Sequence, residues 1–240
     1  LFGGAFHPRA VGNGDIFLIF AAPNEFFMLR VKGILWAALS SSTFGLAPLF
    51  TLLLLGVGYS SFEVLTYRWG VASLCLGAYG LLAGCDFRLG RRELGTVFLL
   101  SLFRAATSLS LVIAYQNIAS GVASTIHFMY PLVVAVVMMC FFRERGSAWT
   151  FAAIGMSIVG AVLLSLGNVD FSHGDTTLGI VSATVSVVAY GGYIVGVRRS
   201  RAVEIDSTVL TCCVMAFGAL FFIAGGLLTG GVRLETDPHT

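Results

Sequence analysis

The chain has 240 residues, of which 57% are hydrophobic and 11% charged, and this composition excludes an ordinary soluble globular domain. The formal net charge is +2 and no basic tract is present, so nucleic acid is not an expected partner. The five cysteines (75, 85, 140, 212 and 213) show no framework spacing, and we expect neither disulfides nor a metal or cofactor.

Residues 1–32 precede the first long apolar run. Their one apolar patch, residues 16–22, is too short to cross a bilayer and lacks the basic lead of a signal peptide. Met28, followed by Arg30 and Lys32, is a natural start. We therefore expect residues 1–32 to be an N-terminal extension that is either disordered or upstream of the true start.

Seven apolar runs follow, and charged residues mark their ends. A helix needs roughly 20 apolar residues to cross about 30 Å of hydrocarbon, and a helix satisfies its own backbone hydrogen bonds in lipid. The runs are residues 33–62, 62–84, 94–115, 118–142, 146–168, 176–197 and 207–230. The sequence predicts an all-α, multi-pass integral membrane protein with seven transmembrane helices in the lipid bilayer.

The loops between these runs differ strongly in basic residues. If alternate loops lie on the same side, ten Lys and Arg residues share one face and only Arg233 lies on the other. Cytoplasmic loops carry the excess of Lys and Arg, so the segment before the first helix is predicted to be cytoplasmic.

An internal repeat links the first and sixth runs. A Gly-Ile, Ala, Ser, Gly pattern over residues 33–45 recurs over residues 179–191, and two further short matches follow at offsets of 145 or 146. A repeat of five helices must enter the membrane from the opposite side the second time. We therefore expect a polytopic bundle of two inverted five-helix repeats, with seven of ten helices present: residues 33–168 form the first repeat and 176–240 begin the second.

The fourth and fifth runs resemble those of EamA domains in the drug/metabolite transporter superfamily. The resemblance rests on residues 119–124 (Ala-Ser-Gly-Val-Ala-Ser), Pro131, Glu144, Gly155 and Gly160, and extends more weakly over residues 33–230. It implies a transporter built from two five-helix repeats that exports small molecules across a bacterial-type inner (plasma) membrane.

Ionisable residues inside a span usually face a cavity or a partner, because they are costly in lipid. Arg104 lies near the middle of the third run, and Ser101, Ser108 and Tyr115 share its face. Arg104 is a candidate for binding substrate, and a structural ion pair is the alternative. Arg68 lies nearer a helix end, where reaching the interface or pairing with a neighbour is favoured.

His127 shares a face with Ser120, Ser124 and Pro131 of the fourth run. Pro131 removes a backbone hydrogen bond and is expected to kink this helix. His127 is a candidate proton relay, and a neutral histidine bonded to a neighbouring helix is the alternative.

Aromatic and hydroxyl side chains line one face of the sixth run and its counterpart in the first. Tyr190 and Tyr193, with Trp36 and Ser40, are candidates for lining a cavity for a small amphipathic molecule, and helix packing is the alternative.

A secondary transporter that moves a small metabolite or drug-like molecule by alternating access, with an anionic or zwitterionic substrate, is the leading prediction. An intramembrane enzyme is less favoured because no protease or hydrolase motif occurs. A seven-helix receptor is disfavoured by the repeat. Proton coupling and homodimer formation are compatible with this reading.

Overall fold

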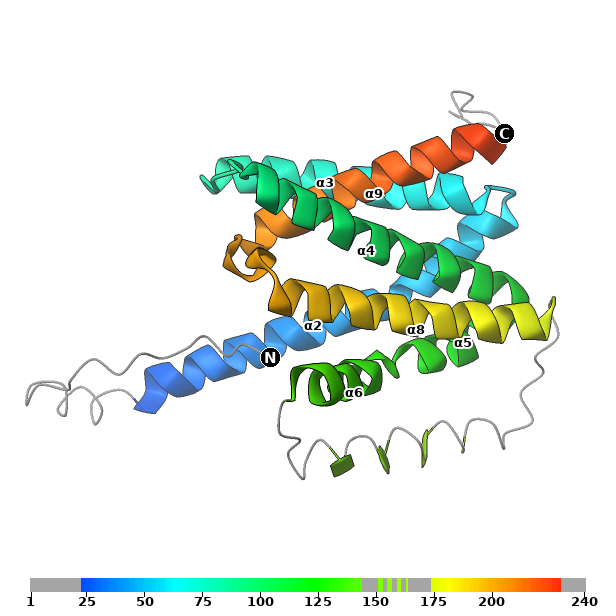
Figure 1. Cartoon of the computed structure of the whole chain (residues 1–240), viewed down its shortest axis with the longest axis horizontal. Helices are drawn as coiled ribbons and strands as arrows, with labels where there is room; N and C mark the ends of the chain where they lie inside the picture. The colour runs from blue at the N-terminus through cyan, green and yellow to red at the C-terminus, as the bar shows by residue number, and fades with distance from the viewer. Residues whose placement is uncertain are drawn as a thin grey trace, which may run out of the picture. The chain divides into compact units, whose positions relative to one another are not determined.

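The computed structural model describes residues 23–143 and 174–229, with seven further residues between 151 and 163. It contains α2 (Pro23–Gly56), α3 (Ser61–Leu82), α4 (Arg91–Asn117), α5 (Ser120–His127), α6 (Tyr130–Phe142), α8 (Thr176–Arg199), the 3-10 helix η1 (Arg201–Glu204) and α9 (Ser207–Thr229) (Figure 1). The chain divides into two compact units, residues 1–49 and 50–240. In the first unit, residues 23–49 are helical, and its exposed side chains include Ile34, Leu35 and Leu39. The fold of the second unit is described below.

Four segments within the described residues are long and apolar enough to cross a membrane: Arg91–Asn117, Ser120–Phe142, Thr176–Arg199 and Ser207–Thr229. Their outward faces expose large apolar side chains such as Phe141 and Leu228, which are at least 80% exposed and favour contact with lipid over water. α3 is not among the four, since Tyr67, Arg68 and Trp69 lower its hydropathy. The protein is thus an all-α, polytopic membrane protein, as predicted, while the fifth predicted span (146–168) lies largely outside the described residues.

Polar side chains cap the N-terminal ends of α3, α8 and α9. Ser60 and Glu63 form a capping box, in which the Ser60 amide donates to Glu63 Oε2 (2.7 Å) and the Glu63 amide donates to Ser60 Oγ (3.2 Å). Asp175 accepts from the first amides of α8, and Asp206 from those of Thr208 (2.8 Å) and Val209 (3.3 Å) in α9. The two amide donors lower the pKa of the Asp206 carboxyl.

Two antiparallel helix pairs build the core. α3 packs along α9. The two helices are antiparallel, as Gly80 lies beside Thr208 at one end of the pair and Phe62 lies beside Gly225 at the other. α4 packs along α8, and Gly196 admits the side chain of Leu100. Gly192 and Gly196 face α4 and allow the two helices to approach closely.

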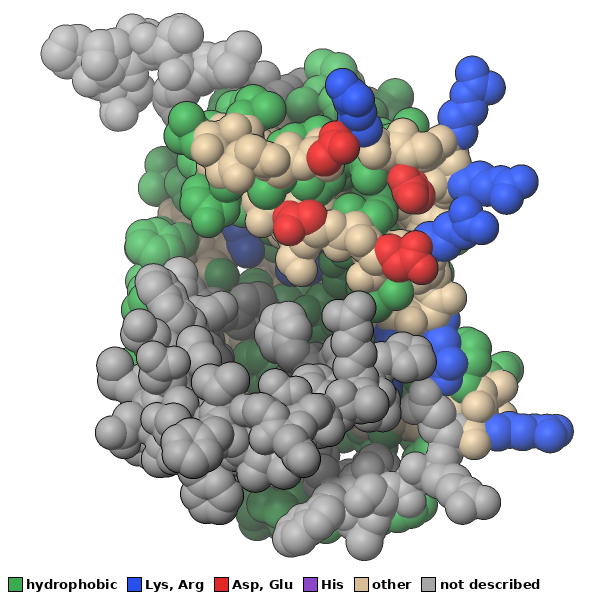
Figure 2. Space-filling model, turned by 90° about the vertical axis from the view of Figure 1, so that its left-hand side faces the viewer, with side chains coloured by type: hydrophobic (Ala, Val, Ile, Leu, Met, Phe, Trp, Pro, Cys, Tyr) green, Lys and Arg blue, Asp and Glu red, His purple; other side chains and the backbone are tan. Residues whose placement is uncertain are grey.

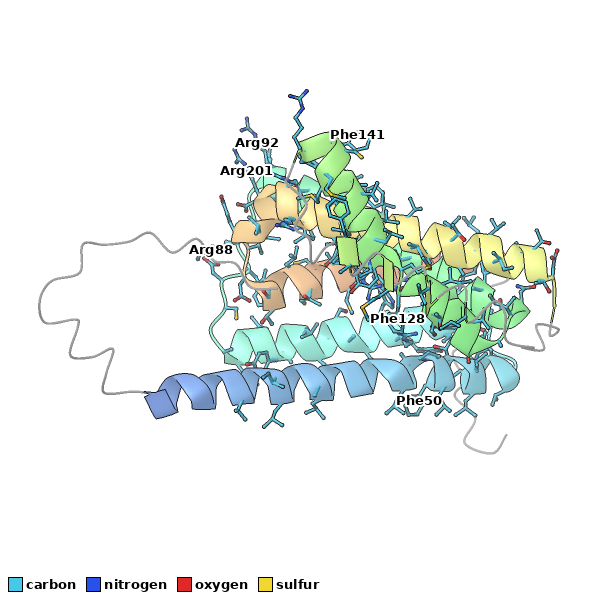
Figure 3. The ribbon with its side chains drawn as sticks, turned by 90° about the horizontal axis from the view of Figure 1, so that it is seen from below. Phe50, Arg88, Arg92, Phe128, Phe141 and Arg201 are labelled. Carbon is cyan, nitrogen blue, oxygen red and sulfur yellow. The ribbon has the colours of Figure 1, made fainter. Side chains whose placement is uncertain are left out.

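The helix ends form two chemically different surfaces. The α3–α4 loop, the C-terminal end of α6 and the α8–α9 connection lie together, since Leu89, Ala202 and Ile205 share one cluster and Arg199 lies over the ring of Phe142 (4.2 Å). Figure 2 looks onto this basic end and shows Lys and Arg side chains gathered along one margin, and Figure 3 places Arg88, Arg92 and Arg201 together. The opposite end carries Gln116, Asn117 and Asp175, where the Asp175 amide donates to Asn117 Oδ1 (3.1 Å).

The fourth predicted span is interrupted at mid-length. α5 ends at His127, and α6 begins at Tyr130 and runs in a different direction (Figure 3). Pro131 has no N–H to donate to the carbonyl of His127, and Leu132 donates instead to the carbonyl of Met129 (3.0 Å). The expected single helix over residues 118–142 is therefore two helices, and the predicted kink is a break.

Candidate functional site: an arginine among aromatic rings

Arg104 lies at the midpoint of α4, about 20 Å from either end at 1.5 Å per residue. Its side chain is half-buried. Nη1 donates to Ser108 Oγ one turn along the same helix (3.4 Å). The predicted polar stripe therefore brings Arg104 and Ser108 together, and the charge lies at the depth at which it is most costly in lipid.

Two aromatic rings from neighbouring helices flank the guanidinium of Arg104. Its central carbon is 5.7 Å from the ring centre of Trp69 in α3 and 5.1 Å from that of Tyr190 in α8. Both distances are within the range of a cation–π interaction. These contacts stabilise the positive charge without neutralising it, so the N–H donors of Arg104 keep their capacity to bind an anion.

Tyr190 joins this arginine site to a wider aromatic surface. Its ring stacks on that of Tyr193 (5.9 Å between centres, 18° between planes) and meets the edge of Tyr130 (4.5 Å, 86°). The two predicted tyrosines of α8 thus lie on one surface with Arg104. The side chains of Trp36 and Ser40 lie outside the described side chains.

His127 occupies the end of α5, at the break in the fourth span. It is only 3% exposed, and its Nδ1 lies 3.0 Å from Ser186 Oγ on α8. The Ser186 hydroxyl donates its single proton to the carbonyl of Ala183 (2.6 Å). Nδ1–H is therefore the donor to Ser186, and in neutral His127 the lone pair is on Nε2. The ring of His127 also lies 5.3 Å from that of Tyr190.

Arg68 adds a second cation to the site. Its Nη1 donates to Thr51 Oγ1 (3.0 Å), and Arg104 lies over the ring of Trp69, the residue that follows Arg68 in α3. Among the described residues, neither arginine contacts a carboxylate. Arg68 therefore pairs with a neutral neighbour, one of the two outcomes expected from the sequence.

A separate cavity of about 450 Å³ lies between α4, α6 and α8. Its walls include Phe103, Val133 and Gly192, with Arg199 at one end. The residues that line this cavity do not include Arg104, Tyr190 or Tyr193, and Gly192 lies about 160° around α8 from Tyr190. The arginine site and the apolar cavity are distinct.

Comparison with known proteins agrees with this architecture. The profile of the EamA-like transporter family matches residues 31–166, more than half of the chain. The chain belongs to the EamA-like transporter family.

One relative of this EamA family member is a protein of Synechocystis sp. named "Uncharacterized transporter sll1319". It is 28% identical over 94 residues, which cover 38% of this chain and 27% of the relative. The chain thus matches little more than a quarter of that relative's length. No solved structure matches the chain.

Several residues around Arg104 and His127 were not predicted from the sequence. Trp69 is 3% exposed and reads as an ordinary core residue in an apolar helix. Tyr130 and Thr51 likewise lack a periodic signal. Ser186 had one, since it is the repeat counterpart of Ser40. Among the described residues, no group of His, Cys, Asp and Glu is arranged to hold a metal ion.

Proposed function

We propose that this membrane transporter moves small anionic or zwitterionic metabolites or drug-like molecules by alternating access, and that Arg104 binds their acid group. The observation that carries the proposal is a half-buried guanidinium at mid-depth with no carboxylate partner among the described residues. The sequence has no Asp or Glu between Glu93 and Glu144 or between Asp175 and Glu204. A guanidinium in such surroundings offers a fixed fork of donors suited to a carboxylate or phosphate.

The helix arrangement supports alternating access. Transporter sites lie near mid-depth, between inverted repeats and beside discontinuous helices. α5 and α6 are discontinuous beside the aromatic surface, and α3 runs antiparallel to its proposed repeat counterpart α9. Both features support two inverted five-helix repeats, with 33–168 as the first and 176–240 as the start of the second.

The proposed direction of transport rests on the family resemblance, and the proposed energy source rests on His127. The basic end of the second unit supports a cytoplasmic location for that end, and export across a bacterial inner membrane is the proposed direction. Coupling to protons through His127 is part of the proposal, and assembly as a homodimer is compatible with it. We infer no enzymatic role, because Ser186, which is hydrogen-bonded to His127, already donates to its own helix.

Uptake into proteoliposomes tests the proposal. The intact protein should take up organic acids, with and without an imposed pH gradient, and Arg104→Ala should abolish uptake while the protein still inserts and folds. Arg88→Ala, which removes a loop arginine at the basic end, is the matched control and should transport normally. Normal acid uptake by Arg104→Ala would show that Arg104 does not bind substrate, and failure of that variant to accumulate would indicate a structural role.

A further inference from the structure

The arginine site contains two cations and no compensating acid among the described residues. Arg68 comes from α3 and Arg104 from α4, and the guanidinium of Arg104 lies 5.7 Å from the ring of Trp69, the residue that follows Arg68 in α3, so the two positive charges repel each other. Like charges held near each other destabilise the empty site. An arrangement of this kind is stabilised when an anion enters it.

Each guanidinium is held in place by a neutral group. Thr51 Oγ1 accepts from Arg68 Nη1, and Ser108 Oγ accepts from Arg104 Nη1. Thr51 is fully buried, so it fixes the Arg68 head group from within the protein. One donor of each head group is used for positioning, which leaves most of the five N–H donors of each arginine for a ligand.

Exposure is consistent with access from outside the protein core. The Arg68 side chain is exposed and lies about two turns from the start of α3, and that of Arg104 is half-buried at the midpoint of α4. The rings of Trp69 and Tyr190 cover part of Arg104 and leave the rest accessible. A ligand can therefore reach both head groups without first displacing a carboxylate.

A monoanion would neutralise only one of these two charges. We propose that the site selects dianions, with Arg68 supplying the second positive charge, so that the substrate carries either a phosphate monoester or two carboxylates. This inference rests on the proposed function, because it gives the substrate class of the same site.

Matched ligand pairs at a single pH of about 7.5 test the inference, because a phosphate monoester, with a second pKa of about 6, is mostly a dianion there. Phenyl phosphate is compared with the monoanion phenyl sulfate, and succinate with its monoamide succinamate. Working at one pH keeps the protonation state of the protein the same for every ligand. Binding is measured by calorimetry on the purified intact protein.

The wild-type protein should bind at least one dianion about tenfold more tightly than its matched monoanion, a difference of about 1.4 kcal/mol. Arg68→Gln should bring this ratio close to one, and Arg68→Lys should retain the preference. A preference confined to the phosphate pair identifies a phosphate ester, and one confined to the succinate pair identifies a dicarboxylate.

A wild-type ratio near one for both pairs overturns the inference, as does an Arg68→Gln protein that keeps the preference. If the Arg68→Gln protein does not accumulate, the wild-type ratios and the Arg68→Lys protein test the inference instead. The two proposals fail differently. Uptake of monoanions that depends on Arg104 but shows no dianion preference leaves the transporter proposal standing and removes this one.

Discussion

At the scale of the residue, Arg104 differs from lysine in more than length. Its planar head group lies against two rings and presents several donors at fixed angles, whereas an ammonium is a single charged point. Arg104→Lys should therefore keep the positive charge but lose the fixed set of guanidinium N–H donors. We expect it to lower the initial rate of acid uptake by about tenfold, the equivalent of 1.4 kcal/mol. Initial rates in proteoliposomes measure this.

Ser108→Ala is the companion variant for Arg104→Lys. It removes only the 3.4 Å hydrogen bond along α4 and should change the rate about twofold or less, because a bond of that length is weak. Equal losses in the two variants would show that positioning by Ser108, and not the shape of the guanidinium, controls binding.

His127 is the residue on which proton coupling depends. With Nδ1–H donated to Ser186, Nε2 is left as the position that gains and loses the proton. His127→Ala should abolish uptake driven by a pH gradient and leave substrate counterflow intact. Unchanged gradient-driven uptake would remove His127 from the mechanism and leave it as a buried residue that joins α5 to α8.

The residues that sequence could identify are those with a local signal. Arg104 and Ser108 are one turn apart on one helix, so periodicity was sufficient to pair them. The contacts of Arg104 with Trp69 and Tyr190 join three helices, and no spacing along the chain encodes them. For the same reason, the proximity of Arg68 to Arg104 could not be predicted: it depends on how α3 is rotated against α4.

At the scale of the element, the helix ends were predicted well where charges or caps mark them. α8 begins at Thr176 and α9 ends at Thr229, each within a residue of the predicted bounds. Pro131 indicated a bend in the fourth span, but the extent of the break could not be read from one proline. It depends on the turn conformations that Phe128 and Met129 adopt next to α8.

Close packing of α3 against α9 makes a prediction about stability. A Cβ added at Gly218 would collide with the rigid ring of Trp69. Gly218→Ala should therefore lower the free energy of unfolding by about 1–3 kcal/mol, the usual effect of overpacking, and should weaken substrate binding by shifting a ring that contacts Arg104. Thermal unfolding in detergent and ligand calorimetry measure the two effects.

Gly95→Ala is the matched control for Gly218→Ala. Gly95 is also within a helix, but a Cβ there would meet nothing within 4 Å among the described residues. It should be neutral or stabilise the protein by up to about 1 kcal/mol, because alanine is the better helix former. A Gly218→Ala protein as stable as the Gly95→Ala protein would show that α3 and α9 separate easily.

At the scale of the whole molecule, the structure shows that the basic loops of the second unit share one end, as their alternation along the sequence predicted. That grouping is decided by charge, because Lys and Arg are retained on the cytoplasmic side during insertion. Loop composition was therefore enough to predict which helix ends lie together. The side of the membrane on which they lie is set by the cell, and labelling can determine it.

Two single-cysteine variants test the orientation, in a background without the five native cysteines. Thr177→Cys is exposed at the opposite end, and Arg201→Cys is exposed at the basic end. An impermeant maleimide added to intact cells should label Thr177→Cys alone, and opening the cells should make Arg201→Cys reactive. Labelling of Arg201→Cys in intact cells, with Thr177→Cys protected, would invert the topology. The proposed export would then have to begin from the opposite end of the helix bundle, because the cytoplasmic substrate would meet the surface formed by Gln116, Asn117 and Asp175.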